Sequence, residues 1–123
     1  MIFELPIRPH PKQRPRIVNG HAYTPQETQE YERAIRQMVL LRMNIEGQKP
    51  YQTWCHLKIT FCYASLKKPK PFCNSRPDID NLLKAIFDAL NGVCYRDDAI
   101  ILRVEATKEY GKYDAILIEM EGE

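Results

Sequence analysis

The sequence predicts an α+β fold in which two main helices pack on one mixed β-sheet, in the element order β-α-β-α-β-β. The prediction rests on short runs with an apolar residue at every second position, longer runs with apolar residues three and four apart, and Gly or Pro residues that separate them. Elements that are apolar on one face bury that face by packing in layers. With 123 residues and no internal repeat, we expect residues 1–123 to form a single domain.

The first two expected elements lie near the amino terminus. Phe3, Leu5 and Ile7 occur at alternate positions, a short strand pattern that ends at two prolines. After a loop, Thr24 opens a capping box, Thr-Pro-Gln-Glu, which predicts a helix with Pro25 at its first position. We expect this helix to end at Gly47 and to bury Tyr31, Ala34, Ile35, Met38, Leu41 and either Leu40 or Met43.

The middle of the chain predicts a long strand, a basic loop and a second helix. From residue 51 to residue 63, every odd position except Thr53 is apolar or aromatic, which indicates a half-buried strand. Residues 65–77 are rich in Lys and Pro and cannot continue this strand. Asp78 is expected to cap a helix that stops at Asn91. The apolar stripe of that helix is Ile79, Leu82, Leu83, Ile86, Phe87 and Leu90.

Two strands, at residues 100–108 and 114–120, complete the expected fold. The segment between them is short and contains Gly111, which is typical of a tight connection. We therefore expect these two strands to pair with each other as a hairpin.

Composition and targeting signals narrow the class of protein. No apolar run approaches the roughly 20 residues that span a bilayer, and the first residues lack the pattern of a signal peptide, so we expect a cytoplasmic protein. The four cysteines contain no C-x-x-C pair, and the three histidines do not complete a zinc pattern. We therefore expect reduced thiols and no structural zinc.

Charge is distributed unevenly along the chain. Residues 1–77 contain 13 Lys or Arg and 5 Asp or Glu, whereas residues 78–123 contain 5 and 11, so the two parts carry net charges of +8 and −6. This asymmetry suggests a basic surface for a polyanion beside an acidic cluster for cations. Alternatively, the fold intermixes both parts and cancels their fields.

Two pairs of carboxylates are candidates for a metal site. Asp78 and Asp80 lie at the start of the expected second helix, and Asp97 and Asp98 lie just before a strand. Hard divalent cations prefer oxygen ligands, and carboxylate-bound Mg²⁺ can activate water for phosphodiester cleavage. The alternative, which spacing alone favours, is that Asp78 and Asp80 only cap the helix. If three such carboxylates converge, they repel by roughly 4 kcal/mol per pair at about 4 Å and need a cation.

Lys84 follows Asp80 by four residues, on the same face of the expected helix. It either forms an exposed ion pair with Asp80 or places its ammonium beside a scissile phosphate. We expect Asp88, one turn further along, to be solvated and not to be a ligand. No serine or cysteine pairs with a histidine in the sequence pattern, which argues against covalent catalysis.

Basic residues gather in two stretches that contain no acidic residue. The first holds Arg8, Lys12, Arg14 and Arg16, and the second holds Lys49, Lys58, Lys67, Lys68, Lys70 and Arg76. Binding to a phosphate backbone explains this pattern economically, and a solvated loop is the alternative. Phe72 or Tyr95 could stack on unpaired bases, although either could also belong to the core.

The segment from Arg76 to Gly92, followed by Tyr-Arg-Asp-Asp at residues 95–98, resembles the signature of RusA-type Holliday junction resolvases. The shared string is D-x-D-N-L-x-K-x-x-x-D-A-L followed by D-D, and the segments at 12–16 and 23–25 are also similar to phage and prophage members of that family. The resemblance covers roughly residues 8–118.

This resemblance implies a homodimer that binds four-way junctions and nicks two symmetric strands with Mg²⁺ or Mn²⁺ in DNA recombination and repair. By position, Asp78, Asp80 and Asp98 match the metal-binding carboxylates and Lys84 matches the catalytic lysine. The pattern gives the ligand role to the second acid of the pair, which leaves Asp97 in a supporting role. Symmetric nicking also favours a two-fold dimer on physical grounds.

Two other functions remain open from the sequence. One is a non-catalytic nucleic-acid-binding recombination accessory module, in which the acids only cap helices. The other is a metal-dependent phosphohydrolase of small nucleotides, which would need the acids but not the long basic stretches.

Overall fold

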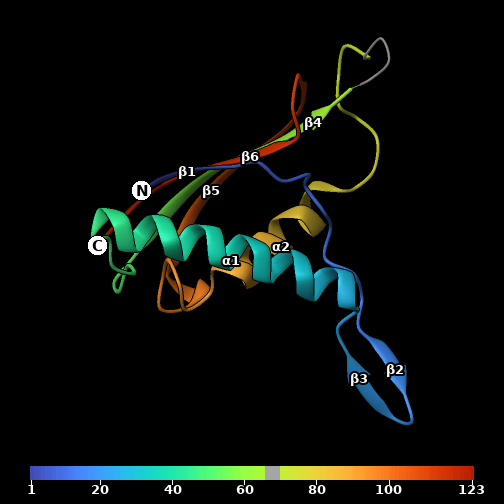
Figure 1. Ribbon diagram of the computed structural model, residues 1–123, viewed down its shortest axis with the longest axis horizontal. Helices are drawn as coiled ribbons and strands as arrows, with labels where there is room; N and C mark the ends of the chain where they lie inside the picture. Colours follow the sequence, from blue (N-terminus) through green and yellow to red (C-terminus); the bar gives the residue numbers. More distant parts are fainter. Residues whose placement is uncertain (66–69) are drawn as a thin grey trace.

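The computed structural model describes residues 1–65 and 70–123, so Lys67 and Lys68 of the expected basic loop lie outside the described residues. Within these residues the chain forms two α-helices, a four-stranded mixed sheet and a small two-stranded sheet (Figure 1), which confirms the α+β class. The elements are β1 (Ile2–Leu5), β2 (Arg16–Val18), β3 (His21–Tyr23), α1 (Gln26–Glu46), β4 (Cys55–Ala64), α2 (Ile79–Leu90), a 3-10 turn (Asp98–Ile100), β5 (Ile101–Gly111) and β6 (Ala115–Gly122).

The strand order in the main sheet is β1-β6-β4-β5. β4 runs parallel to β5 and antiparallel to β6. The expected hairpin of the last two strands is therefore wrong, because β4 lies between them. Neighbouring strands lie about 4.8 Å apart, so the connection from Gly111 to Ala115 spans only about 10 Å as it passes the end of β4. There the backbone N–H of Ala64 donates to Asp114 Oδ1 at 2.9 Å.

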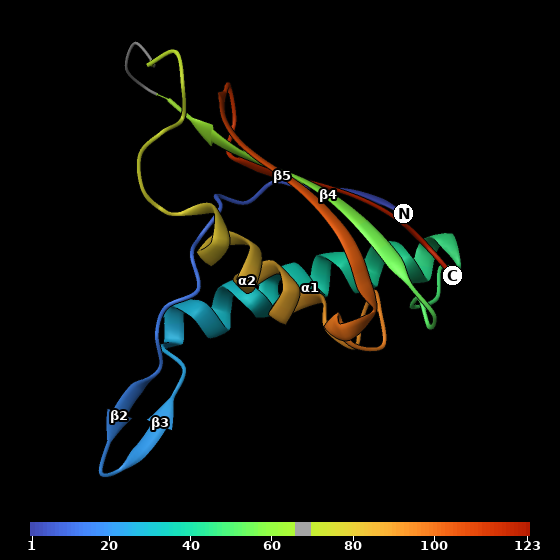
Figure 2. The same ribbon diagram turned by 180° about the vertical axis from the view of Figure 1, so that it is seen from behind.

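β4 occupies the centre of the sheet because it is the most continuously buried strand. Its odd-numbered residues, Cys55, Leu57, Ile59, Phe61 and Tyr63, are all buried, as the alternation predicted. α1 and α2 lie side by side on one face of the sheet (Figures 1 and 2), so these residues form the core between sheet and helices.

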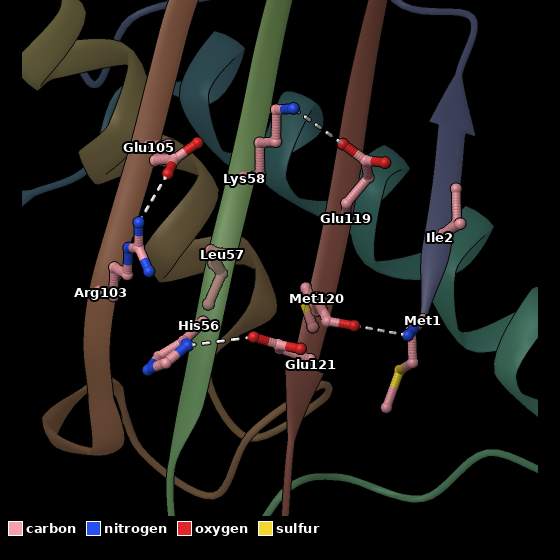
Figure 3. A pocket seen from close by; sticks show the side chains of 10 residues that line it. All are labelled: Met1, Ile2, His56, Leu57, Lys58, Arg103, Glu105, Glu119, Met120 and Glu121. Carbon is pink, nitrogen blue, oxygen red and sulfur yellow. Dashed lines mark hydrogen bonds and ion pairs between the residues drawn. The ribbon is translucent and has the colours of Figure 1, made fainter.

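The opposite sheet face is polar. It carries the ion pairs His56–Glu121, Lys58–Glu119 and Arg103–Glu105 around a shallow pocket of about 370 Å³ (Figure 3). The amino-terminal ammonium borders this pocket and donates to Met120 O at 2.7 Å. The charges on this face largely satisfy one another. Lys58 of the second basic stretch borders the pocket and pairs with Glu119, whereas the expected catalytic and metal-binding residues do not line it.

The first helix differs in detail from its prediction. Pro25 occupies the N-cap position and, within the described part of the chain, no side chain caps the helix, so the expected capping box of Thr24 is wrong. Gly47 ends the helix in the left-handed conformation, as expected, with φ of 66°. The buried residues are Thr28, Tyr31, Ile35, Val39 and Met43.

The predicted buried face of α1 included Leu41, whose side chain is 63% exposed. From Tyr31 onward the buried residues repeat every four positions, and a residue two positions after Val39 points to the opposite side of a helix. Ala34 and Met38 are half-buried at the border of the core. The second helix matches its prediction more closely, with Leu82, Ile86 and Leu90 fully buried.

The hairpin formed by β2 and β3 lies where the sequence predicts a loop. Its turn is Asn19-Gly20, with φ of 52° and 77°. Positive φ at both central residues is what the tight hairpin turn between twisted strands requires. The Asn-Gly pair was the local signal that could have revealed it. The hairpin projects away from the helices and the main sheet (Figures 1 and 2).

Neither helix in the described ranges combines the length and the hydropathy needed to cross a bilayer.

Candidate functional site

α2 presents a charged row on its exposed side. Asp80, Lys84 and Asp88 follow one another at four-residue spacing, the spacing of neighbours along one helix face. The opposite side of α2 is buried against α1 and the sheet. This amphipathic pattern fixes the row toward solvent, because turning it inward would expose Leu82 and Ile86.

The segment that carries Asp97 and Asp98 returns to the end of this row. Tyr95 precedes it and is fully buried, and its hydroxyl donates to Phe87 O at 2.9 Å. This hydrogen bond ties the segment to the last turns of α2 and keeps Asp97 and Asp98 near Asp88. Tyr95 therefore belongs to the core and does not stack on bases.

The neighbours of Asp98 change the pKa of its carboxyl group. A hydrogen bond with Asp97, slight burial and the negative charges of Asp97 and Asp88 raise the pKa of Asp98, while the positive charge of Lys84 lowers it in part. Asp98 thus interacts directly with Asp97 and feels the charges of Asp88 and Lys84. Neighbouring like charges favour protonation or a cation.

Lys12 joins the amino-terminal segment to the same place. Its ammonium contacts Glu32 Oε1 at 2.6 Å and Asp88 Oδ2 at 3.1 Å, and its backbone N–H donates to Asn81 O at 3.0 Å. Burial lowers the pKa of Lys12, but the hydrogen bonds to Glu32 and Asp88 outweigh burial, so the net shift is upward.

Two expectations change as a result. Lys12 was expected to bind phosphate, but its side chain is only 16% exposed and is already paired with two carboxylates. Asp88 was expected to be solvated, but it is an ion-pair partner with a side chain that is 33% exposed. Glu32 could not be identified from the sequence as the other partner, since no local pattern relates Glu32 to Lys12.

Asp78 and Asp80 lie at the other end of α2. They border a shallow depression with Cys73, Ile79, Ala106, Thr107 and Lys108. Lys108 Nζ donates to Ser75 O at 2.7 Å and to Pro77 O at 2.8 Å, and so holds the residues before α2 against β5.

Within the residues that it describes, the structure does not show the alternative uses of these residues, which were helix capping and an ion pair. Asp78 occupies the N-cap position, but no side-chain cap hydrogen bond forms among the described residues. Lys84 forms no ion pair within 4.0 Å in residues 1–65 and 70–123, so the expected alternative pairing with Asp80 is not formed. Both carboxylates and the ammonium are exposed and available to a ligand.

The acids suit a hard divalent cation by donor type, since all are carboxylates on or near α2. In the part of the chain that the structure describes, no group of three or more His, Cys, Asp or Glu residues has the geometry to hold a metal ion. Asp78 and Asp80 lie at one end of the row and Asp98 at the other, with Lys84 between. The convergence of Asp78, Asp80 and Asp98 on one ion stays a prediction.

The remaining basic residues divide into exposed and paired groups. Arg14 and Arg16 lie at the β2–β3 hairpin and Lys70 and Arg76 precede α2; all are exposed, and none forms an ion pair with another described residue. Phe72 lies between the latter two, and its side chain is 73% exposed. Arg8 instead pairs with Asp114 at 2.9 Å and lies over the ring of Tyr63.

Comparison with known proteins assigns this arrangement to a family. The family model described as endodeoxyribonuclease RusA matches residues 6–121, which is nearly all of the 123 residues. No curated protein sequence matches the chain. The matched range includes α2 with its charged row, the Asp97–Asp98 pair and the hairpin of β2 and β3.

Proposed function

Because the chain belongs to the RusA family of endodeoxyribonucleases, we propose that it is a divalent-metal-dependent enzyme that resolves Holliday junctions by symmetric nicking in DNA recombination and repair. The observation that supports this most is the state of Asp78 and Asp80. Both are exposed carboxylates at the start of α2, and Asp78 is not used as a side-chain cap within the described residues. If these acids served only as helix caps, their carboxylates would be engaged in cap hydrogen bonds and would not be free to bind a cation.

In this proposal Asp78, Asp80 and Asp98 would hold Mg²⁺, for which Mn²⁺ could substitute. A cation held there would supply a nucleophilic water near neutral pH and would balance charge on the attacked phosphate. Carboxylate oxygens are the ligands that such a hard cation prefers. Asp97 donates to or accepts from Asp98 and so supports its orientation.

Lys84 has the second catalytic role that we propose. Lys84 is the middle residue of the charged row, and its ammonium forms no ion pair in the described ranges. A free ammonium at this point stabilises the negative charge that develops on a phosphate in the transition state. Asp88, by contrast, is paired with Lys12, which it shares with Glu32.

We also propose that the enzyme acts as a homodimer. Two nicks related by a two-fold axis require two sites with the same relationship, which an isologous dimer supplies. With a chain mass of 14.5 kDa, light scattering should give a particle of twice that mass.

The decisive experiment compares Asp80→Asn with wild type on a labelled four-way junction. We expect Asp80→Asn to bind the junction in EDTA and to fail to nick it in Mg²⁺. Glu105→Gln is the matched control, since it removes one negative charge from the exposed sheet face and should nick normally. Wild-type nicking by Asp80→Asn would contradict the proposed role of the acids.

The same assay tests the alternatives. A wild-type protein that binds junctions but nicks none in Mg²⁺ would indicate the non-catalytic accessory module. Hydrolysis of small nucleotide phosphodiesters without junction cleavage would indicate a nucleotide phosphohydrolase.

A further inference from the structure

We call residues 14–24, which comprise β2, β3 and their flanking residues, the arm. The arm has the features of a ligand-binding surface. Every residue of both strands is exposed, and within the described residues the two strands pair only with each other. An isolated two-stranded hairpin is at best marginally stable in water. Ile17 and Val18 are nevertheless 75% and 51% exposed.

The charge of the arm indicates what kind of ligand fits it. No acidic residue occurs between Glu4 and Glu27, and Arg14 and Arg16 are exposed and form no ion pair with any other described residue. A surface with cations and no anions repels basic partners and attracts a polyanion. The phosphate backbone of DNA is such a ligand.

The shape of the arm fits one groove of duplex DNA. The cross-strand partners are Arg16 with Tyr23, Ile17 with Ala22 and Val18 with His21, so polar and apolar side chains share the ribbon. The major groove is about 12 Å wide and admits a two-stranded β-ribbon. Apolar side chains there can contact thymine methyl groups while arginines reach the flanking phosphates.

The base of the arm is attached to α1 and to α2, the helix that carries the charged row. Lys12 is bonded to Asn81 and Asp88 of α2, as described above. Gln13 accepts from Thr28 Oγ1 at 3.2 Å, and Thr28 is fully buried in α1. At the other end of the arm, the side-chain amide of Gln29 donates to Thr24 O at 2.6 Å. A duplex held by the arm would therefore keep a fixed position relative to Asp80 and Lys84.

We propose that the arm is a DNA-binding ribbon that lies in the major groove of a duplex next to the cleavage site. The proposal rests on the proposed function for the identity of that duplex, which is an arm of the branched substrate. The arm binds duplex by shape and charge, and the acidic row performs the cleavage.

The first test removes the charges of the arm. Arg14→Gln combined with Arg16→Gln is compared with Arg103→Gln combined with Lys112→Gln, a control pair of exposed cations on the polar sheet face and in the connection between β5 and β6. Binding of a labelled junction and of a linear duplex is measured in EDTA over a range of salt concentrations. Each lost phosphate contact reduces the slope of log K against log salt by about 0.9. We expect the arm variant to lose about two such contacts and the control none.

The second test alters the shape of the arm and keeps its charge. Gly20→Val retains both arginines but places a β-branched residue at φ of 77°, a conformation that strains it. Protection of guanine N7 from dimethyl sulfate reports the major groove. We expect wild type to protect guanine N7 atoms in one junction arm and Gly20→Val to lose that protection. Because the altered residues are exposed, circular dichroism and the unfolding midpoint should match those of wild type.

Three results would overturn the proposal. They are an unchanged salt slope in the arginine variant, full guanine N7 protection by Gly20→Val, and loss of the dimer in either variant, which would make a second copy the occupant of the arm. The outcome is independent of catalysis, since Asp80→Asn should bind with the wild-type slope. If the wild-type protein fails to nick the junction while the arm variants show the expected binding effects, the result would count against the proposed nuclease and not against the ribbon.

Discussion

The ammonium of Lys12 lies 3.1 Å from Asp88 Oδ2 and thereby connects the amino-terminal segment to the helix that carries the acidic row. Glu32 of α1 completes this contact from the other side at 2.6 Å. Three segments that are far apart in the sequence thus meet at one cation. This contact explains how the base of the β2–β3 arm keeps a fixed position relative to α2.

Replacing Lys12 by Met should destabilise the protein. The substitution keeps the length of the side chain but leaves Glu32, whose side chain is 14% exposed, and Asp88 without their counter-charge. We expect the free energy of unfolding in urea to fall by about 1–3 kcal/mol. Arg42→Met is the control, because it removes an exposed pair with Glu46 and should cost less than about 0.5 kcal/mol. Equal losses in the two variants would show that the Lys12 contact has no special weight.

Replacing Lys84 by Ala should separate catalysis from stability. Since the ammonium forms no ion pair with the other described residues, we expect the free energy of unfolding to change by less than about 0.5 kcal/mol. Single-turnover nicking should slow by roughly 100-fold, as for the loss of one group that stabilises transition-state charge. Lys112→Ala, in the exposed connection between β5 and β6, should nick at the wild-type rate. A Lys84→Ala enzyme of normal rate would remove Lys84 from the mechanism.

Replacing Asp97 by Asn should lower the pKa of Asp98. The hydrogen bond with Asp97 is the largest influence that raises this pKa and the charge of Asp97 adds to it, whereas an Asn amide can donate to the carboxylate instead. A carbon-detected NMR titration of the Asp98 carboxyl in metal-free buffer would measure the shift. An unchanged titration would mean that the two side chains do not interact in solution.

The cysteines should differ sharply in reactivity. All four lie in the described residues and are free, but Cys55 and Cys94 are 0% exposed. Burial raises the pKa of the Cys94 thiol from 9.0 to about 12, so almost no thiolate forms there at pH 8. In a thiol-reagent assay, half-buried Cys73 should react in the native protein, whereas Cys55 and Cys94 should react only in urea.

The same shift predicts a pH dependence of stability. The pKa of Cys94 is higher in the folded than in the unfolded chain, so the unfolded chain binds fewer protons between these two values. The stability that the neutral thiol contributes is complete below pH 9.0 and is lost as the pH rises toward about 12. Cys94→Ala should show a smaller loss of stability over this range than wild type.

Elements with a strong local pattern could be predicted from the sequence. The alternation along β4 and the apolar stripe of α2 repeat at the periods of a strand and a helix, so burial follows from spacing alone. Leu41 was misassigned because several registers of an apolar face fit α1, and only packing against β1 and α2 selects one. The insertion of β4 between β5 and β6 could not be predicted, because strand order depends on contacts that no local pattern encodes.

The site shows the same division. Asp78, Asp80, Lys84 and the Asp97–Asp98 pair could be singled out because together they resemble the RusA signature, whereas their spacing alone favoured helix capping and a surface ion pair. The partner of Lys12 could not, because counting nearby charges in the sequence misses Glu32 and Asp88, which reach Lys12 only through the fold. The pairing of Arg8 with Asp114 was hidden for the same reason.

β4 and β5 are parallel neighbours, so the chain must travel back along the whole sheet between them, and α2 makes this return. Within the described part of the connection from β4 to α2, residues 70–77 belong to no strand of the sheet. Evolution can therefore vary residues 70–74, which precede the contacts of Lys108 to Ser75 and Pro77, while the sheet and the helices keep their arrangement. A redesign of DNA preference is best begun there, since a change confined to these residues would leave Asp78, Asp80 and Lys84 in place.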